Sequence, residues 1–306
     1  MLNEQEELIK IVGALPMVTI GVPLFNNELT VAKTIESVIK QNYPNIEVVL
    51  SDDYSTDNTY DICISLTRDF KNIRIVKQAE NLGLYKNFKF VLDEAKGQYF
   101  MWLCGDDSIS EDYISNNVYF LAKNLEYVSA YSLVLYDYMN GVKIGHDYNF
   151  EHSFRDRLQS FFEDPFQSHG ILFSLIRTDV LRKFPGLGKS YFAADWFLDL
   201  YLLHCGKIRS RNDGYLLLGT NGVSKQVKSG RLFMKNKIGY IFPFSAFMSE
   251  TITYFFRAKP RSLIDLAALI KHLSKLQYKN SVNTFTALMK TAIKSFIISF
   301  IYIKKK

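Results

Sequence analysis

The chain has 306 residues, of which 48% are hydrophobic and 22% are charged, a composition typical of a folded globular protein and not of a disordered segment. Its net charge of +6 is unevenly distributed, because residues 231–306 contain 14 lysines and arginines against 2 acidic side chains. Residues 1–230 carry the opposite balance, with 23 basic and 29 acidic side chains. Opposite charges on the two regions predict two different roles.

The first ten residues, MLNEQEELIK, are acidic and polar, which is unlike a secretory signal. No apolar run reaches the ~18 residues that span a bilayer, and the three cysteines, Cys63, Cys104 and Cys205, show no metal-ligand spacing. We therefore expect a cytoplasmic protein in a reduced compartment, soluble or peripheral to a membrane. Nucleic acid is not an expected partner, because the basic residues lie on apolar helices and not among aromatic stacking residues.

In chain order, the first hundred residues alternate between β-branched apolar runs and segments with helical spacing. The pattern predicts strands at 17–25, 46–53, 72–78 and 98–104, and helices at 28–41, 58–70 and 84–95. Further along, it predicts a strand at 127–138, a shorter one at 170–176, and helices at 177–184 and 193–206. Such alternation favours a parallel sheet covered on both faces by helices, with ligands at the carboxyl ends of the strands.

Adjacent aspartates follow two of the predicted strands at this edge, Asp52 with Asp53 and Asp106 with Asp107. Neighbouring carboxylates repel each other and cost desolvation energy unless a cation lies between them. Hard oxygen ligands suit Mg²⁺ or Mn²⁺, so the second pair predicts a metal site. The alternative for Gly-Asp-Asp-Ser is an ordinary exposed turn or a helix cap.

These segments resemble glycosyltransferase family 2, a group of inverting enzymes with a GT-A fold. The resemblance is carried by residues 18–59, residues 80–107 and, more faintly, residues 170–208. It implies an α/β GT-A domain over residues 1–230, with a Rossmann-like, mostly parallel sheet flanked by helices. The nucleotide-sugar half would occupy about 17–125 and the acceptor half 126–230, and residues 231–306 would form a basic amphipathic helical region.

The resemblance implies a nucleotide-sugar pocket in which one aspartate of the 52/53 pair accepts a hydrogen bond from the base. Glu28 could instead be a first-turn acid, Lys86 a solvated lysine, and Gly83 a residue of positive φ or of close approach to the ligand. Asp57 and Asn58 are better explained as caps of the following helix. Residues 219–231 resemble a lid over the diphosphate or a polar linker. The implied contacts are Pro23, Leu24, Phe25, Glu28, Asp52, Asp53, Gly83, Lys86, Asp106 and Lys225.

The metal ligands implied by the resemblance are Asp106, Asp107 and His169, for Mn²⁺ or Mg²⁺. Cys104 stands where the motif of the family has a further acid, which leaves the division of roles between the two aspartates open. Asp195 is the implied catalytic base, and its apolar neighbours would raise its pKa toward a useful value. Asp199, one helical turn further on, is its rival.

The predicted activity is metal-dependent, inverting hexosyl transfer from a nucleotide sugar, expected to be a UDP-sugar, to a hydroxyl of a glycan or lipid-linked acceptor in surface polysaccharide synthesis. The alternative is a non-catalytic nucleotide-sugar-binding or docking protein of such a pathway. A nucleotidyltransferase would need a basic, glycine-rich loop after the first strand, and PLFNNE is not one. The basic region is expected to contact the inner face of the cell membrane, or alternatively to mediate packing or homo-oligomer formation.

Overall fold

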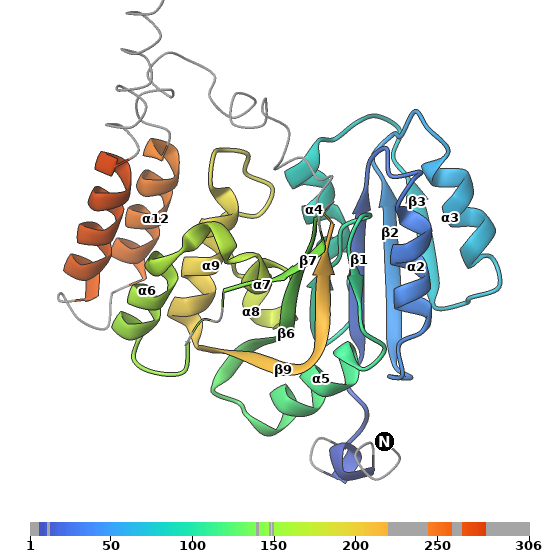
Figure 1. Cartoon of the computed structure of the whole chain (residues 1–306), viewed down its shortest axis with the longest axis horizontal. Coiled ribbons are helices and arrows are strands. Elements are labelled where there is room, and N and C mark those ends of the chain that lie inside the picture. The colour runs from blue at the N-terminus through green and yellow to red at the C-terminus, as the bar shows by residue number, and fades with distance from the viewer. Residues whose placement is uncertain are drawn as a thin grey trace, which may run out of the picture. The chain divides into compact units, whose positions relative to one another are not determined.

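The computed structural model describes residues 6–10, 13–138, 141–146, 148, 150–219, 244–258 and 265–279. The chain divides into two compact units, Met1–Ser190 with Asp195–Gln226, and Tyr191–Ala194 with Val227–Lys306. Within the described residues, the first unit contains a nine-stranded sheet flanked by helices (Figure 1). The domain boundary predicted at residue 230 lies outside the described residues and stays a prediction.

The first half of the sheet is parallel, with the strand order β3-β2-β1-β4. All four predicted strands and all three intervening helices of this half are confirmed. The strands are β1 (Val18–Leu24), β2 (Ile46–Asp52), β3 (Ile73–Lys77) and β4 (Tyr99–Trp102). The helices are α2 (Val31–Ile39), α3 (Thr59–Thr67) and α4 (Leu84–Asp93).

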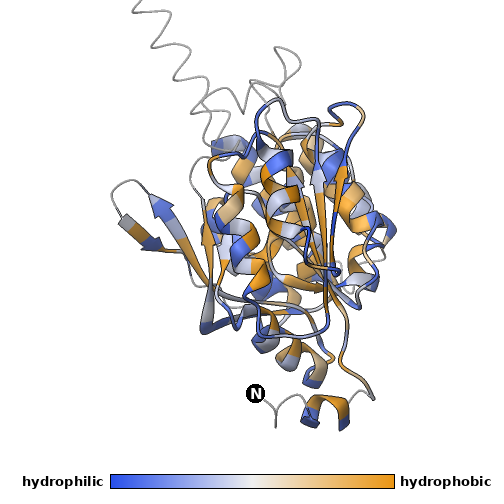
Figure 2. Cartoon of the chain, turned by 90° about the vertical axis from the view of Figure 1, so that its right-hand side faces the viewer, coloured by the Kyte–Doolittle hydropathy of each residue, from blue (hydrophilic) through white to orange (hydrophobic). Residues whose placement is uncertain are grey.

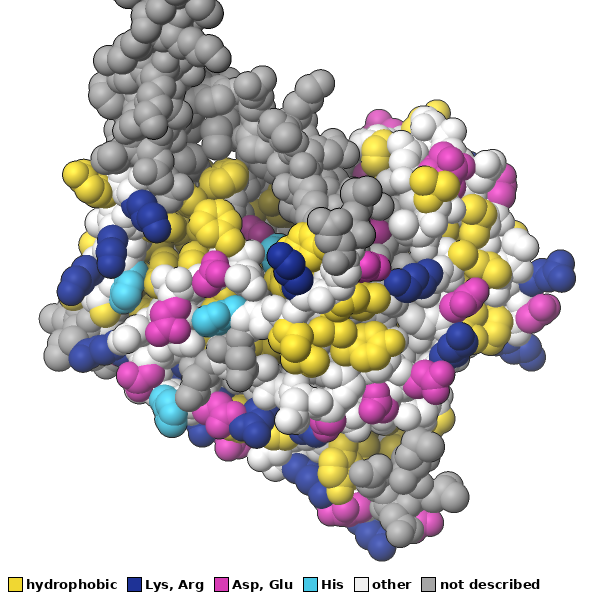
Figure 3. All heavy atoms as spheres, in the orientation of Figure 1, with side chains coloured by type: hydrophobic (Ala, Val, Ile, Leu, Met, Phe, Trp, Pro, Cys, Tyr) yellow, Lys and Arg dark blue, Asp and Glu magenta, His cyan; other side chains and the backbone are white. Residues whose placement is uncertain are grey.

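Helices cover both faces of the parallel strands. Successive side chains of β1 point to opposite faces: Val22 lies with Ile35 of α2, whereas Gly21 lies against Val91 of α4 and Phe100 of β4. Figure 2 shows the hydrophobic residues concentrated on the strands and the inner sides of these helices. On the visible outer surface of this half, acidic and basic side chains are interspersed (Figure 3). The predicted α/β layering is therefore confirmed.

The second half of the sheet is mostly antiparallel and differs in part from the prediction. The predicted strand at 170–176 is wrong over most of its length: α7 (His169–Leu172) forms first, and β8 (Leu175–Arg177) follows. Hydrogen bonds explain the difference, because Phe173 N donates to the carbonyl of His169 at 3.0 Å and Ser174 Oγ donates to that of Ile171 at 2.6 Å. The other strands of this half are β5 (Ser108–Ile109), β6 (Tyr127–Tyr138), β7 (Gly141–Ile144) and β9 (Lys207–Leu218).

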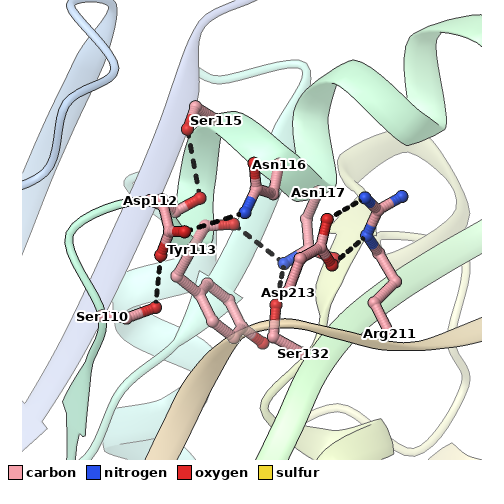
Figure 4. A network of polar contacts seen from close by, with 9 residues as sticks. All are labelled: Ser110, Asp112, Tyr113, Ser115, Asn116, Asn117, Ser132, Arg211 and Asp213. Carbon is pink, nitrogen blue, oxygen red and sulfur yellow. Dashed lines mark hydrogen bonds and ion pairs between the residues drawn. The ribbon is translucent and has the colours of Figure 1, made fainter.

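Strand β9 runs parallel to β6 and pairs Leu218 with Tyr136, which brings the end of β9 to the edge where the aspartates lie. Polar contacts fix α5 (Tyr113–Lys123) against this pair of strands (Figure 4). Asn117 Nδ2 of α5 donates to Ser132 Oγ of β6 at 3.1 Å. The remaining helices of the first unit are α6 (Phe154–Glu163), η1 (Pro165–Gln167), α8 (Thr178–Leu181) and α9 (Ala194–Cys205).

The described part of the second unit contains α12 (Ser245–Arg257) and a helix at 265–279. On α12, Phe247, Thr251 and Phe255 recur every fourth residue and are buried. Phe244 N donates to Gln277 Oε1 at 3.2 Å, which links the two helices. None of the helices that the structure describes is long and apolar enough to span a membrane. Residues 280–306, which carry the last lysines of the predicted membrane contact, lie outside the described residues.

A buried amide joins the carboxyl ends of β1 and β2. Asn87 of α4 is 2% exposed, and its Nδ2 donates to the carbonyls of Ser51 at 3.0 Å and Leu24 at 3.4 Å. Its Oδ1 accepts from Ser51 Oγ at 2.6 Å. One side chain thus satisfies polar groups from two strands, and buried polar groups left without partners are costly.

We predict that Asn87→Ala lowers the free energy of unfolding by about 2–4 kcal/mol, because it leaves several buried groups unpaired. Urea denaturation of the purified protein measures the change. The control is Asn72→Ala, which removes the half-exposed bond from Asn72 Nδ2 to the carbonyl of Ile46 and should cost less than half as much. Equal losses in the two variants would contradict the assigned role.

Candidate active site

The centre of the candidate site is the turn that follows β4, in which Asp107 is only 4% exposed. Its Oδ1 accepts from Gly219 N at 2.9 Å, and its Oδ2 accepts from Cys104 N at 3.3 Å. Burial, with the neighbouring Asp106 charge, raises the pKa of Asp107 well above its usual range. The carboxylate of Asp107 therefore joins its own turn to the residue that follows β9.

Two threonines at the start of α2 hold the backbone of the same turn. Thr30 Oγ1 donates to the carbonyl of Gly105 at 2.7 Å, and Thr34 Oγ1 donates to that of Asp107 at 2.7 Å. The sequence analysis did not select either residue. Their four-residue spacing at the amino end of a predicted helix was the available signal, since it places both hydroxyls on one face.

Asp106 is more open than Asp107. It is partly exposed, and its carboxylate accepts no hydrogen bond from a described residue apart from its own backbone. Burial raises its pKa. Gly219 lies against it, so that a Cβ at position 219 would come within 2.4 Å of the Asp106 carbonyl oxygen and 2.7 Å of Oδ2. Only glycine allows this approach, which was not anticipated from the sequence.

Cys104 occupies the first position of this turn, where the family motif has an acid. Burial raises the pKa of its thiol well above the usual range, and the charges of Asp107 and Asp106 add to the effect. Cys104 therefore contributes a neutral thiol, and its backbone amide is the group that contacts Asp107.

The other aspartate pair is used mainly to hold loops together. Asp53 is 2% exposed, and its two carboxylate oxygens accept from Leu82 N at 2.6 Å and Gly83 N at 3.0 Å. Gly83 has a φ of 84° with no atom within 4 Å of an added Cβ, so the positive φ accounts for the glycine. Asp52 is fully buried, and its Oδ2 accepts from Ser55 N at 3.3 Å.

The two loops above these strands expose aromatic rings. Phe25 is 48% exposed and Tyr54 is 51% exposed. The residues Asn26 and Tyr54 have positive φ values of 53° and 63°. Asn26 N donates to Ser55 Oγ and Thr56 N donates to Asn26 Oδ1, both at 2.9 Å. The loops are therefore bound to each other while their rings face solvent.

Glu28 and Asp57 cap each other's segments. Glu28 Oε2 accepts from Asn58 N at 3.1 Å and from Asn58 Nδ2 at 3.0 Å, and Asp57 Oδ2 accepts from Glu28 N at 3.1 Å. Asp57 Oδ1 also accepts from Thr59 N at 3.0 Å, which makes it the cap of α3. Pro23 and Leu24 end β1 in the register expected, Lys86 is exposed in the first turn of α4, and Lys225 lies outside the described residues.

On the acceptor side, Asp195 lies in the first turn of α9 beside His169. Burial raises the pKa of Asp195, and the interaction with His169 opposes this shift. Burial lowers the pKa of His169, which therefore tends to be neutral. The His169 ring lies edge-to-face on Tyr136 with centroids 5.9 Å apart, and its Nδ1 is 3.1 Å from the Tyr136 hydroxyl.

Contacts connect the two acidic positions across the sheet. Asp107 binds Gly219 N, the preceding residue Leu218 pairs with Tyr136, and Tyr136 contacts His169. His169 interacts electrostatically with Asp195. The folded chain therefore places residues from β4, β6, β9, α7 and α9 in one connected edge, although they are far apart in the sequence.

A divalent cation fits Asp106 by the chemistry of the donor, because a partly buried carboxylate without a hydrogen-bond donor gains most from a cation. Among the described residues, no three histidines, cysteines or acids form a group that could hold a metal. A cation at Asp106 would therefore take its other ligands from substrate oxygens and water. His169 lies with Tyr136 and Asp195, and its predicted metal contact stays a prediction.

Comparison with known proteins decides the family. Residues 19–184, more than half of the chain, match the family model described as glycosyl transferase family 2. The chain belongs to glycosyltransferase family 2.

Over 105 residues, this family 2 member is 35% identical to the UDP-Glc:alpha-D-GlcNAc-diphosphoundecaprenol beta-1,3-glucosyltransferase WfaP of Escherichia coli, a match that covers 34% of the chain and 41% of the relative. The chain spans from 27% to 48% of the length of the curated relatives that it matches.

Two solved structures show the same fold. The structure of Staphylococcus aureus TarS 1–349 in complex with UDP superposes with a TM-score of 0.55 at 17% identity, covering 91% of this chain and 92% of that one. The mannosyltransferase PcManGT from Pyrobaculum calidifontis, in complex with GDP-Man and Mn²⁺, gives 0.57 at 15% identity, covering 100% and 88%. The predicted GT-A fold is confirmed.

The left-handed conformation of Tyr54 gives a test of the exposed loop. A bulky residue at positive φ costs about 1–2 kcal/mol, and glycine gives back about 0.5–1 kcal/mol of that through the entropy of the unfolded chain. We predict that Tyr54→Gly raises the free energy of unfolding slightly, measured by urea denaturation. The contrasting variant is Asn26→Gly, which loses the bond to Thr56 N and should destabilise the protein. Destabilisation by Tyr54→Gly would show that the ring itself holds the loop.

Proposed function

We propose that this protein is an inverting glycosyltransferase that moves a sugar from a nucleotide sugar to a hydroxyl of a glycan or lipid-linked acceptor. The observation that carries the proposal is the connected edge, with the open carboxylate of Asp106 at one end and the buried Asp195 beside His169 at the other. A displacement with inversion needs one group to stabilise the leaving diphosphate and another to activate the attacking hydroxyl on the opposite side of the sugar.

The donor is proposed to be a UDP-sugar that binds above the carboxyl ends of β1 and β2. The exposed rings of Phe25 and Tyr54 offer apolar surface to a base, and backbone groups at the end of β1 offer hydrogen bonds. Support for uracil comes from the UDP complex of TarS and the UDP-Glc donor named for WfaP. The GDP-Man complex of the mannosyltransferase makes guanine the rival base.

Asp106 is the residue that would hold Mn²⁺ or Mg²⁺, and Asp107 would fix the turn that presents it. The cation, when bound, supplies positive charge to the leaving diphosphate. Thr30 and Thr34 hold the backbone of the turn, and Gly219 leaves the space beside the Asp106 carboxylate. Together these residues determine where the diphosphate can bind.

Asp195 is proposed to remove the proton from the acceptor hydroxyl, whose oxygen then attacks the anomeric carbon while the bond to the diphosphate breaks. An ionised Asp195 beside a neutral His169 suits this role, because a cationic imidazole would lower the basicity of the carboxylate. Burial raises the pKa of Asp195, so the carboxylate is a stronger base than an exposed aspartate.

The acceptor is proposed to be a lipid-linked saccharide diphosphate in surface polysaccharide synthesis, as the name of WfaP states for that enzyme. This proposal requires action at the cytoplasmic face of the membrane, and the 14 basic residues of 231–306 would provide electrostatic attraction to anionic lipids. A nucleotide-sugar-binding protein without transfer activity remains the alternative, and the variants below separate the two.

The metal proposal predicts that Asp106→Ala abolishes the Mn²⁺-dependent part of UDP binding, measured by isothermal titration calorimetry with and without Mn²⁺. We expect at least a tenfold loss of affinity in the presence of Mn²⁺ and little change in its absence, because the carboxylate without a cation repels the diphosphate. The control is Asp61→Ala, an exposed acid in the first turn of α3. Undiminished Mn²⁺-dependent binding in Asp106→Ala would move the metal elsewhere.

The base proposal predicts that Asp195→Asn reduces turnover by about 10²–10⁴-fold while UDP-sugar affinity stays within a few-fold of wild type. Transfer from UDP-glucose to a synthetic N-acetylglucosaminyl diphosphate lipid measures the first, and calorimetry the second. In the wild type, turnover should fall as the pH decreases through a pKa above that of an ordinary aspartate, because a base acts only when ionised. Full turnover in Asp195→Asn would exclude it, and sugar-nucleotide binding by a wild type without transfer would support the alternative.

A further inference from the structure

Helix α9 carries a second buried carboxylate that the proposed reaction does not use. Asp199 lies four residues after Asp195, so both side chains lie on the same face of α9. Asp199 is 1% exposed, and its Oδ2 accepts from Ser168 Oγ at 2.6 Å. Its Oδ1 is buried and has no hydrogen-bond partner.

The partner of Asp199 immediately precedes the partner of Asp195. Ser168 is 3% exposed and is followed by His169, the first residue of α7. Two carboxylates one turn apart on α9 therefore engage two consecutive residues, Asp199 through a short hydrogen bond and Asp195 through its interaction with His169. Such an arrangement fixes both the distance and the rotation of the His169 segment relative to α9.

The charge state of Asp199 agrees with this role. Burial raises the pKa of Asp199 well above its usual range, and the neighbouring Asp195 raises it further. A neutral carboxylic acid at position 199 still accepts the Ser168 hydrogen bond but adds no second negative charge to the face that holds Asp195. It therefore leaves Asp195 as the ionised group.

We propose that Asp199 is a positioning residue, which clamps Ser168 and thereby holds His169 against Asp195. The inference rests on the proposed function, because it assigns the clamp to the acceptor side of that site. The clamp itself is a structural statement about the segment 168–172, and it can be tested without any transfer reaction.

The experiment compares wild type with Ser168→Ala, Asp199→Ala and Asp199→Asn. Hydrogen–deuterium exchange of the segment 168–172 should be faster in the first two variants and unchanged in Asp199→Asn, whose amide oxygen still accepts from Ser168. In the transfer assay, Ser168→Ala and Asp199→Ala should lower kcat by about 10–100-fold, because a small misplacement of a reacting group is sufficient for such a loss. KM for UDP-glucose should stay within a few-fold, and Asp199→Asn should recover most of kcat.

The matched control is Ser110→Ala, which removes a serine–aspartate bond of 2.7 Å to Asp112 (Figure 4) and should change neither exchange at 168–172 nor kcat. Ser168→Ala removes a single oxygen and keeps the test decisive if Asp199→Ala does not fold. Unchanged exchange in Ser168→Ala overturns the clamp. Faster exchange with a wild-type kcat overturns its positioning role, whereas a wild type that transfers no sugar while the exchange pattern holds contradicts the proposed function alone.

Discussion

The candidate site depends on the two hydrogen bonds accepted by the buried carboxylate of Asp107. One comes from the same turn and the other from Gly219, 112 residues later in the chain. Because a buried carboxylate needs such donors, the end of β9 is drawn to the end of β4. This contact closes the mostly antiparallel half of the sheet onto the parallel half and brings Tyr136, through its pairing with Leu218, to the same edge.

The sequence predicted the parallel half well because its strands are buried on both faces and read as continuous apolar runs. It did not predict β9, whose first residues, KIRSRNDG, are polar and whose Gly214 has a positive φ. At the site, Asp106, Asp107 and Asp195 were found because each directly follows or begins a predicted element. Thr34, Gly219 and Tyr136 were not, since pairing between distant segments brings them there, and no local pattern encodes that pairing.

Acidic residues expected at the nucleotide proved to have mostly structural partners. Asp53 binds the amides of the turn before α4, and Glu28 binds Asn58 at the start of α3. Carboxylates are strong acceptors for free amides at helix starts and turns, so an acid in a nucleotide-binding loop can shape the loop without contacting the ligand. The sequence alone could not separate these uses, because both place an acid at the end of a strand.

The position of Cys104 has a consequence for the chemical reactivity of the protein. Thiols react with alkylating reagents and oxidants as thiolates, and burial together with two neighbouring carboxylates keeps this thiol protonated. A cysteine in the middle of the proposed donor site is therefore inert under conditions that modify ordinary exposed cysteines. Thiol-directed probes can report on Cys205, which is partly exposed, while the turn that carries Asp106 stays chemically intact.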